Sequence, residues 1–183
     1  TFIVPGDNEW NDCNDPEKAW QFWESTFLNF EQNWNIDWEI AHQQEQKENL
    51  AFVYREVLFI GINLVGGRIH DQAEWDEKIS YDLDWLKFCL NNFDSETAVV
   101  FAQANPDDKH TEFINGFEIL ARIYSKQILF IHGDGHKWHY ENPWLVPNMI
   151  RVQVDKGGIA DPLQVTITGN KSKLFKFERN AFN

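Results

Sequence analysis

Short apolar runs alternate with stretches whose apolar residues recur every three or four positions. The runs, which suit buried strands, lie at residues 1–4, 49–54, 56–64, 97–103 and 127–132. The stretches, which suit helices with one buried face, lie at about 16–32, 72–91 and 110–124. Residues 33–46 have a weaker pattern and are expected to form a loop that can hold a short helix. Near the end of the chain, period-two segments at 149–154 and 163–168 predict antiparallel strands, and residues 174–177 predict a last strand.

This alternation favours an α/β layered fold that turns to strands near its end. No repeat or linker divides the chain, so residues 1–183 are expected to form a single domain. Asn14 or Asp15 can cap the first helix, with Pro16 at its first position.

Composition and charge narrow the function. The 183 residues include 15 Phe and 9 Trp and are 43% hydrophobic, which predicts a packed core. The net charge of −13 disfavours nucleic acid and anionic lipid as partners, whereas it suits divalent cations. A solvated acidic surface explains most of these charges equally well. No apolar run reaches the roughly 18 residues that a membrane span requires.

Two segments share one design, a buried strand that runs into a tight polar turn. They are Ile3-Val4-Pro5-Gly6-Asp7-Asn8-Glu9-Trp10 and Leu129-Phe130-Ile131-His132-Gly133-Asp134-Gly135-His136. A third strand end places Gln103 and Asn105 at a comparable position. In α/β sheets, ligands collect at the carboxyl ends of strands. If the three strands are neighbours, the side chains that converge are Asp7, Asn8, Gln103, Asp134 and His136.

Carboxylate, amide and imidazole groups together suit a divalent cation such as Mn, Mg, Fe or Zn. Each part also has a simpler interpretation. Asp7-Asn8 after Pro5-Gly6 is an ordinary turn, and His136 alone is more often a surface residue than a ligand. Gln103 and Asn105 can be capping residues.

The ordered set resembles the calcineurin-like metallophosphoesterases. That family has a Gly-Asn-His-Asp/Glu motif after one strand, a His at a second strand end, and Gly-His-x-His after a third. The corresponding residues here are Gly6-Asp7-Asn8-Glu9, Gln103 and Gly133-Asp134-Gly135-His136. The match is closest to a divergent branch with a Gly-Asp-Asn-Glu-Trp signature and an Asp-Cys pair, here Asp12-Cys13. The resemblance extends to about Asp155 and implies a layered β-sandwich flanked by helices, of which this chain is the C-terminal half.

The resemblance also implies roles. Asp7, Gln103, Asp134 and His136 take the places of metal ligands. Asn8 replaces the His that protonates the leaving group, and Glu9 takes the place of the carboxylate that orients it. Asn105 and His132 are expected to bind the phosphate ester substrate. Because Asn8 has no proton to give near neutral pH, general-acid assistance of about 10²- to 10⁴-fold would be absent or come from another residue. Candidates are His110, His132 and His139.

The family's Asp-x-His and Gly-Asp-x-x-Asp motifs do not precede Thr1. We therefore expect the N-terminal half to be a separate or missing polypeptide. Three hypotheses follow. The chain is part of a metal-dependent phosphoesterase, a catalytically degenerate relative that serves as an interaction or structural module, or a cation- or carbohydrate-binding protein. The last would use Trp10, Trp138 and Trp144 as a stacking platform.

Overall fold

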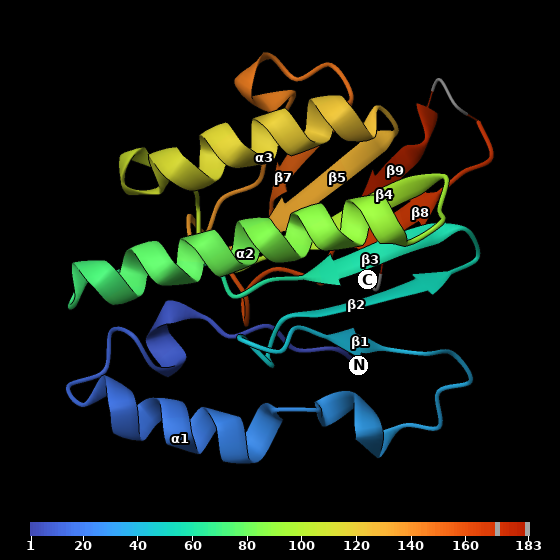
Figure 1. The fold of residues 1–183 in the computed structure, drawn as a ribbon. Helices are drawn as coiled ribbons and strands as arrows, with labels where there is room; N and C mark the ends of the chain where they lie inside the picture. Colours follow the sequence, from blue (N-terminus) through green and yellow to red (C-terminus); the bar gives the residue numbers. More distant parts are fainter. Residues whose placement is uncertain (171–172, 182–183) are drawn as a thin grey trace.

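A seven-stranded mixed sheet forms the centre of the molecule, and two long helices cover one of its faces (Figure 1). The computed structural model describes residues 1–170 and 173–181. The strands of this sheet are β1 (Ala41–His42), β2 (Leu50–Tyr54), β3 (Val57–Gly61), β4 (Thr97–Phe101), β5 (Gln127–His132), β6 (His139–Glu141) and β7 (Met149–Gln153). The helices are α1 (Pro16–Phe27), α2 (Gln72–Asn92) and α3 (Thr111–Tyr124), with 3₁₀ turns at Asp7–Glu9, Phe30–Asn33, Asp108–His110 and Pro143–Leu145. Strands β8 (Gln164–Ile167) and β9 (Phe175–Glu178) form a separate antiparallel pair.

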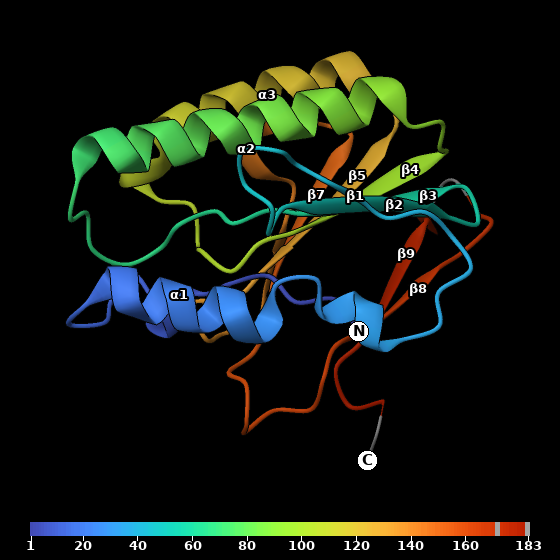
Figure 2. The same cartoon turned by 60° about the horizontal axis from the view of Figure 1, so that its bottom comes forward.

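The inner strands are parallel and the flanking strands are antiparallel. The order is β1-β2-β3-β4-β5-β7-β6, with parallel pairing from β3 through β4 and β5 to β7. The connections β3-α2-β4 and β4-α3-β5 place both helices on the same face (Figure 2). Leu58, Val100 and Phe130 are fully buried in the core beneath these helices. The mixed α/β architecture predicted from the sequence is therefore observed.

The opposite face of the sheet is covered differently. The β8–β9 hairpin packs there, and it shares a second apolar cluster with Val99, Leu129 and Val152 (Figure 2). Within residues 1–170 and 173–181, this hairpin is the only pair of strands outside the main sheet. The second layer is thus much smaller than the first.

Residues 1–4 form no strand, contrary to the prediction. They are extended, but in the described part of the chain they have no neighbouring strand to pair with. Their side chains pack on the sheet face instead, since Phe2 stacks on Phe52 with ring centroids 4.4 Å apart. An apolar run becomes a strand only where another edge accepts its backbone hydrogen bonds.

Helix α1 begins as predicted and ends earlier. Asp15 caps it by accepting a hydrogen bond from the Lys18 N–H at 3.1 Å. It stops at Phe27 rather than near residue 32, and Asn29 then takes a left-handed conformation with φ of 58°.

Aromatic rings and one lysine attach α1 to the rest of the molecule. Trp20 and Trp23 stack 5.1 Å apart, and Trp10 meets Trp20 edge-on. The Lys78 ammonium of α2 lies 5.0 Å from the Trp10 ring centre and 5.3 Å from that of Trp20. This cation–π contact links α1 to α2.

Strand β7 has a different direction from the one predicted. It pairs parallel with β5, and only its other edge, with β6, is antiparallel. Period-two spacing identifies a strand and does not encode the direction of its neighbour. The strands predicted near 163–168 and 174–177 are confirmed as the antiparallel β8–β9 pair.

A buried polar network joins α2 to the loops beside β2 and β3. Asp82 Oδ1 accepts hydrogen bonds from Asn49 at 2.8 Å and from Gln46 at 3.3 Å. Asn49 in turn accepts from the backbone of Asn63 at 2.7 Å, and Asn63 donates to Glu48 at 2.7 Å. Burial raises the pKa of Asp82 to about 8, and the nearby Glu48 adds to the shift. Asp82 therefore carries a proton at pH 7.

Candidate functional site

The N-terminal turn and the loops after β4 and β5 meet at the carboxyl ends of these strands. The backbone N–H of Gly133 donates to the carbonyl of Gln103 at 3.0 Å, which joins the two loops. The Gln103 side chain reaches the N-terminal turn, where its Nε2 donates to Asp7 Oδ1 at 2.9 Å. Asp7 and Gln103, which are 96 positions apart in sequence, are thus in direct contact, as the sequence predicted.

Gly6 allows this close approach. A Cβ atom on Gly6 would lie 2.4 Å from Glu9 Oε2 and 3.0 Å from Gln103 Cγ. Real Cβ atoms essentially never come so close to another heavy atom, so any side chain at Gly6 would push Glu9 or Gln103 away.

Asp7 and Asp134 form the acidic part of the site. Asp7 is buried, and its Oδ1 also accepts from the Asn8 backbone N–H at 3.0 Å. Burial raises the pKa of Asp7, the Asp134 carboxylate raises it further, and the hydrogen bond from Asn8 opposes both. A second carboxylate close to the buried Asp7 favours a cation or a proton between the two groups.

Gln103 has an oxygen with no partner. Its Oε1 is buried and accepts no hydrogen bond from any described residue. A buried acceptor without a donor costs about 1–3 kcal/mol, so such an atom calls for a ligand, an ion or a water molecule. Asp7, Gln103 and Asp134 together therefore fit the oxygen-rich side of a divalent-cation site.

The remaining predicted ligand and the catalytic residues are less well placed. His136 is exposed, has a left-handed backbone with φ of 58°, and makes no hydrogen bond within the described chain. Asn8 and Glu9 are also exposed, and the Asn8 amide lies 3.4 Å from Asp7 Oδ1. Over residues 1–170 and 173–181, no three His, Cys, Asp or Glu side chains lie close enough to hold a metal ion. The described residues therefore do not by themselves form a complete metal site.

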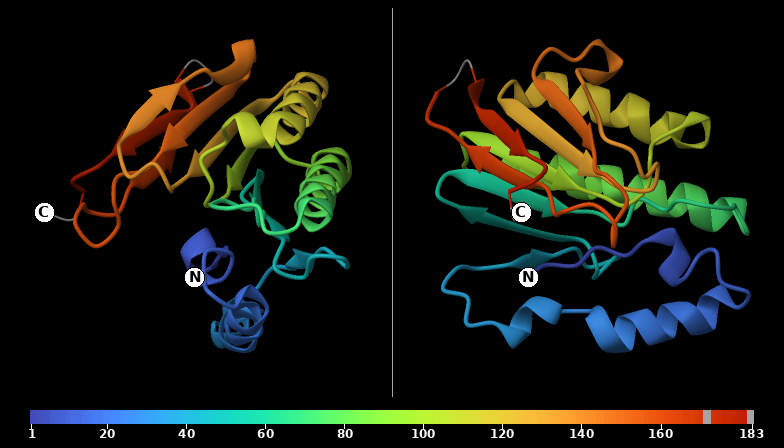
Figure 3. Two further views of the ribbon diagram at one scale, coloured as in Figure 1. Left: turned by 90° about the vertical axis from the view of Figure 1, so that its left-hand side faces the viewer. Right: turned by 180° about the vertical axis from the view of Figure 1, so that it is seen from behind.

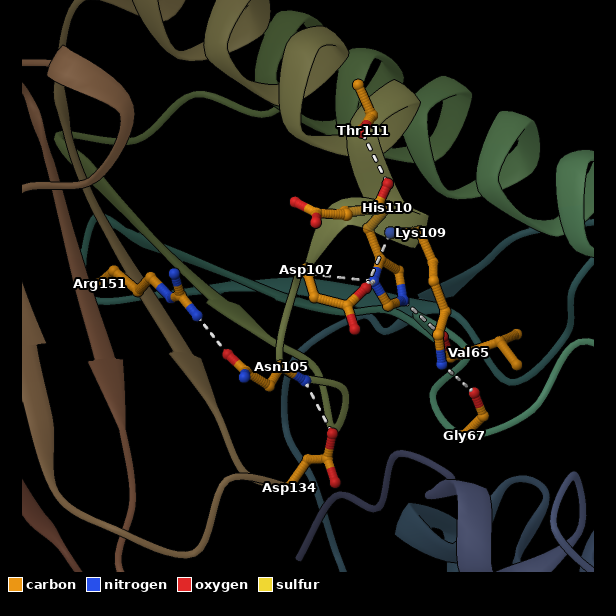
Figure 4. Close-up of polar contacts among 10 residues, drawn as sticks. Val65, Gly67, Asn105, Asp107, Lys109, His110, Thr111, Asp134 and Arg151 are labelled. Atoms are coloured by element: carbon orange, nitrogen blue, oxygen red, sulfur yellow. Dashed lines mark hydrogen bonds and ion pairs between the residues drawn. The ribbon is translucent and has the colours of Figure 1, made fainter.

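Arg151 is the residue of this region that sequence reasoning missed. It lies on β7, mostly buried, and its guanidinium donates to His132 Nε2 at 2.9 Å and to Glu141 at 3.1 Å. It also donates to the side-chain oxygen of Asn105, whose backbone N–H lies 3.4 Å from Asp134 Oδ2 (Figure 4). The sequence did contain one signal for it, an arginine within the apolar strand pattern of residues 149–154. A guanidinium that is buried in a strand needs several hydrogen-bond acceptors nearby, which indicates a polar cluster.

These contacts occupy the Nε2 of His132 and the side-chain oxygen of Asn105, the two predicted substrate-binding residues. His132 accepts from Arg151 through Nε2, so its proton is on Nδ1, which donates to the Gly133 carbonyl at 3.1 Å. Burial and the Arg151 charge lower the pKa of His132 to about 3. His132 is therefore neutral at pH 7, and its lone pair is already used.

The other histidines considered as proton donors have partners too. His110 is buried between Asp107, 2.9 Å from its Nδ1, and the Val65 carbonyl, 2.8 Å from its Nε2 (Figure 4). His139 lies 3.1 Å from Glu141 on the surface.

His110 and Lys109 hold the glycine loop that follows β3. Lys109 Nζ donates to the Gly67 carbonyl at 2.7 Å (Figure 4). Gly67 has φ of +75°, a conformation that glycine adopts without strain. The adjacent Gly66 lies against Gln103 and Asp7, so this loop forms one wall of the site.

The three tryptophans proposed as a stacking platform do not form one. Trp10 is buried beside Trp20, and Trp144 packs on Phe117 and Phe130. Trp138 meets Phe177 of the β8–β9 hairpin edge-on. These indoles pack against neighbouring aromatic rings and so anchor the loops that carry them.

Comparisons with protein-family models, with curated proteins and with solved structures find no match for this chain. No helix in the described ranges is both long and apolar enough to cross a bilayer.

Proposed function

We propose that this chain is the C-terminal half of a calcineurin-like metallophosphoesterase domain and contributes part of a metal site for phosphate ester hydrolysis. The observation that supports this most is the contact of buried Asp7 with the amide nitrogen of Gln103, whose side-chain oxygen has no partner among the described residues, next to Asp134. Asp7, Gln103 and Asp134 would hold a divalent ion (Mn, Fe, Zn or Mg), with His136 as a fourth ligand. Such an ion would supply positive charge to stabilise the phosphate oxygens.

The chain's own residues would position the ester around that charge. The Asn8 amide can donate a hydrogen bond to a phosphate oxygen, and Glu9 can orient it. The Asn105 amide nitrogen remains available for the same purpose, because Arg151 occupies only its oxygen. Neither amide gives up a proton near pH 7, so the leaving group must take its proton from water or from another segment.

Catalytic metal sites use about four to six ligands. The proposal therefore includes a complementary N-terminal segment that supplies further ligands and completes the second layer of a β-sandwich.

The alternative is a catalytically degenerate relative that acts as an interaction or structural module. Two observations favour it. No described group of three His, Cys, Asp or Glu residues can hold a metal, and Asn8 stands where an acid would be needed.

Metal binding separates the two readings. We would titrate the chain with Mn²⁺ and follow binding by electron paramagnetic resonance. For Gln103→Leu and Asp134→Asn we expect an affinity about tenfold or more below that of the wild type. Asp84→Asn, which removes the same charge from the exposed side of α2, should bind like the wild type.

Equal Mn²⁺ affinity in all four proteins would reject the metal site and with it the enzyme. If binding depends on Gln103 and Asp134, hydrolysis of bis-p-nitrophenyl phosphate is measured next, with and without the complementary segment. Site-specific binding without turnover in the completed protein would favour the degenerate module.

A further inference from the structure

The sheet face opposite α2 and α3 has an apolar strip, at Phe59 and Phe101, that is only partly buried. The β8–β9 hairpin packs on one side of this face and residues 1–5 on the other (Figure 3). Two cavities, of about 580 and 330 Å³, lie against this face and both have Phe59 and Phe101 in their walls; the loop of residues 154–163 also lines the larger one. They therefore adjoin and form one gap over β3 and β4.

One border of this gap is the free edge of β8. Strand β8 pairs with β9 and with no other strand of the described chain. Val165 and Ile167 of β8 line the larger cavity, whereas Phe177 of β9 contacts Trp138 and Tyr140 near β6. Thus β9 lies on the β6 side, and the unpaired edge of β8 faces the gap.

The other border is the N-terminal segment. Phe2 and Val4 line the smaller cavity, and the segment is extended without belonging to a strand ladder in residues 1–170 and 173–181. The gap therefore has an aromatic floor and unpaired backbone on both sides.

These features fit one kind of occupant. An extended polypeptide can satisfy the free backbone groups of a sheet edge and place alternate side chains in apolar pockets. A small apolar molecule would fill the cavities and leave those backbone groups unpaired. A helix is about 10 Å wide and has no backbone groups to offer.

We propose that β8 and residues 1–5 border a docking slot for an extended segment of a partner polypeptide, which adds as a β-strand over Phe59 and Phe101. Its inward side chains would be apolar at every second position. Its outward side chains would be basic, because this chain has a net charge of −13. The slot lies in the layer that the complementary N-terminal segment of the proposed function would complete, so that segment would be one such partner. Strand docking itself does not depend on the metal site, since neither Asp7 nor Gln103 takes part.

The probe is a pool of peptides about nine residues long, with Val, Ile or Phe alternating with Lys or Thr. Binding to the 183-residue chain is measured by fluorescence anisotropy, and amide hydrogen exchange is followed by mass spectrometry. We expect selected peptides to bind and to slow exchange in 163–168 and 1–6, while exchange in α3 stays unchanged. Peptides N-methylated at alternate residues, which lose donors and keep their side chains, should bind at least tenfold more weakly.

Phe101→Ser and the milder Phe59→Leu test the floor of the slot. Each should weaken peptide binding several-fold or more, whereas Phe22→Ser, on an exposed position of α1, should not. Circular dichroism checks that each variant is folded. If Phe101→Ser does not fold, Phe59→Leu still tests the floor of the slot.

Several results would overturn the proposal. One is that no peptide slows exchange in 163–168; another is that N-methylated peptides bind equally well. A concentration-dependent dimer that Phe59→Leu disrupts would make a second copy the occupant. Binding of a fatty acid that the peptides cannot displace would make a lipid-like molecule the occupant of the slot.

Discussion

Asp82 and His132 are titratable side chains that burial keeps neutral at pH 7. Their pKa values shift in opposite directions: that of Asp82 rises to about 8, and that of His132 falls to about 3. Burial is the largest cause in both cases, because it penalises the charged form of either group. The two residues therefore give the stability of the protein opposite dependences on pH.

Asp82→Asn should flatten the decline of stability that runs from about pH 4 to about pH 8. Folded Asp82 keeps its proton up to about pH 8, whereas an unfolded aspartate loses it near 3.8, so between these values the folded state binds more protons. The free energy of unfolding then falls as pH rises, by at most about 1.4 kcal/mol per pH unit, and levels off above the folded pKa. The asparagine keeps the carbonyl that accepts from Asn49 and cannot titrate.

Urea unfolding from about pH 5 to about pH 8 measures this slope. The matched control is Asp84→Asn, two residues further along α2 and exposed. Identical slopes in the wild type and Asp82→Asn would show that Asp82 is ionised in the folded protein.

Arg151→Gln should raise the pKa of His132 and destabilise the protein. Because the folded pKa of His132 lies below its ordinary 6.5, stability is lost as pH falls from about 6.5 towards 3, and a smaller shift reduces that loss. The shorter side chain cannot satisfy both His132 and Asn105, which should cost about 1–3 kcal/mol at pH 7.

Imidazole resonances followed by NMR report the His132 pKa directly, and urea unfolding reports the stability. Arg179→Gln removes an equal charge from the exposed Asp155 pair and serves as the control. An unchanged His132 titration would mean that Arg151 does not shift the pKa of His132.

At the scale of elements, the turn between β2 and β3 is strained. Arg55 and Glu56 have φ of 48° and 64°, so both central residues of this two-residue hairpin lie in the left-handed region. Turns of this kind favour Asn-Gly, whereas residues with larger side chains cost about 1–2 kcal/mol each there.

The double substitution Arg55→Asn, Glu56→Gly should therefore stabilise the protein by about 1–2 kcal/mol. Thermal and urea unfolding measure it. The control is Asp84→Gly, in which a glycine also replaces an acidic residue but in the middle of α2. There we expect the free energy of unfolding to fall by about 1 kcal/mol. A destabilised hairpin variant would mean that the Arg55 stacking on Tyr54 outweighs the strain.

The elements that sequence predicted well are those with many periodic residues. Helix α2 was expected at 72–91 and lies at Gln72–Asn92, and β5 lies where it was expected. Predictions failed where pairing decides the outcome, as in residues 1–4, which have no adjacent edge, and β7, whose neighbour set its direction.

The sequence pattern also placed some residues of the candidate site correctly and missed others. The strand-end pattern placed Gln103 and Asp134 together because β4 and β5 are adjacent parallel strands, whereas Asp7 follows an extended segment outside the sheet and reaches Gln103 through its side chain. It could not reveal Arg151, which comes from the body of β7 and reaches Asn105 and His132 only through tertiary packing.

At the scale of the whole molecule, the excess of negative charge affects the stability of the folded chain. With 29 acidic and 16 basic side chains, the folded chain repels itself, and dissolved salt screens that repulsion. Raising the ionic strength from about 0.01 M to about 0.15 M should therefore raise the melting temperature. Differential scanning calorimetry in NaCl tests this, and a fall in melting temperature would mean that local ion pairs outweigh the net repulsion.

The turn after β5 also bears on how the protein ages. An Asp-Gly sequence such as Asp134-Gly135 isomerises when the glycine nitrogen attacks the aspartate carboxyl group and forms a succinimide. In the folded turn the Gly135 N–H donates to the Gly133 carbonyl at 2.9 Å, which hinders its deprotonation and attack. Unfolding releases that nitrogen. Isoaspartate at Asp134 would therefore accumulate in stored protein as a chemical record of the time that this loop has spent open.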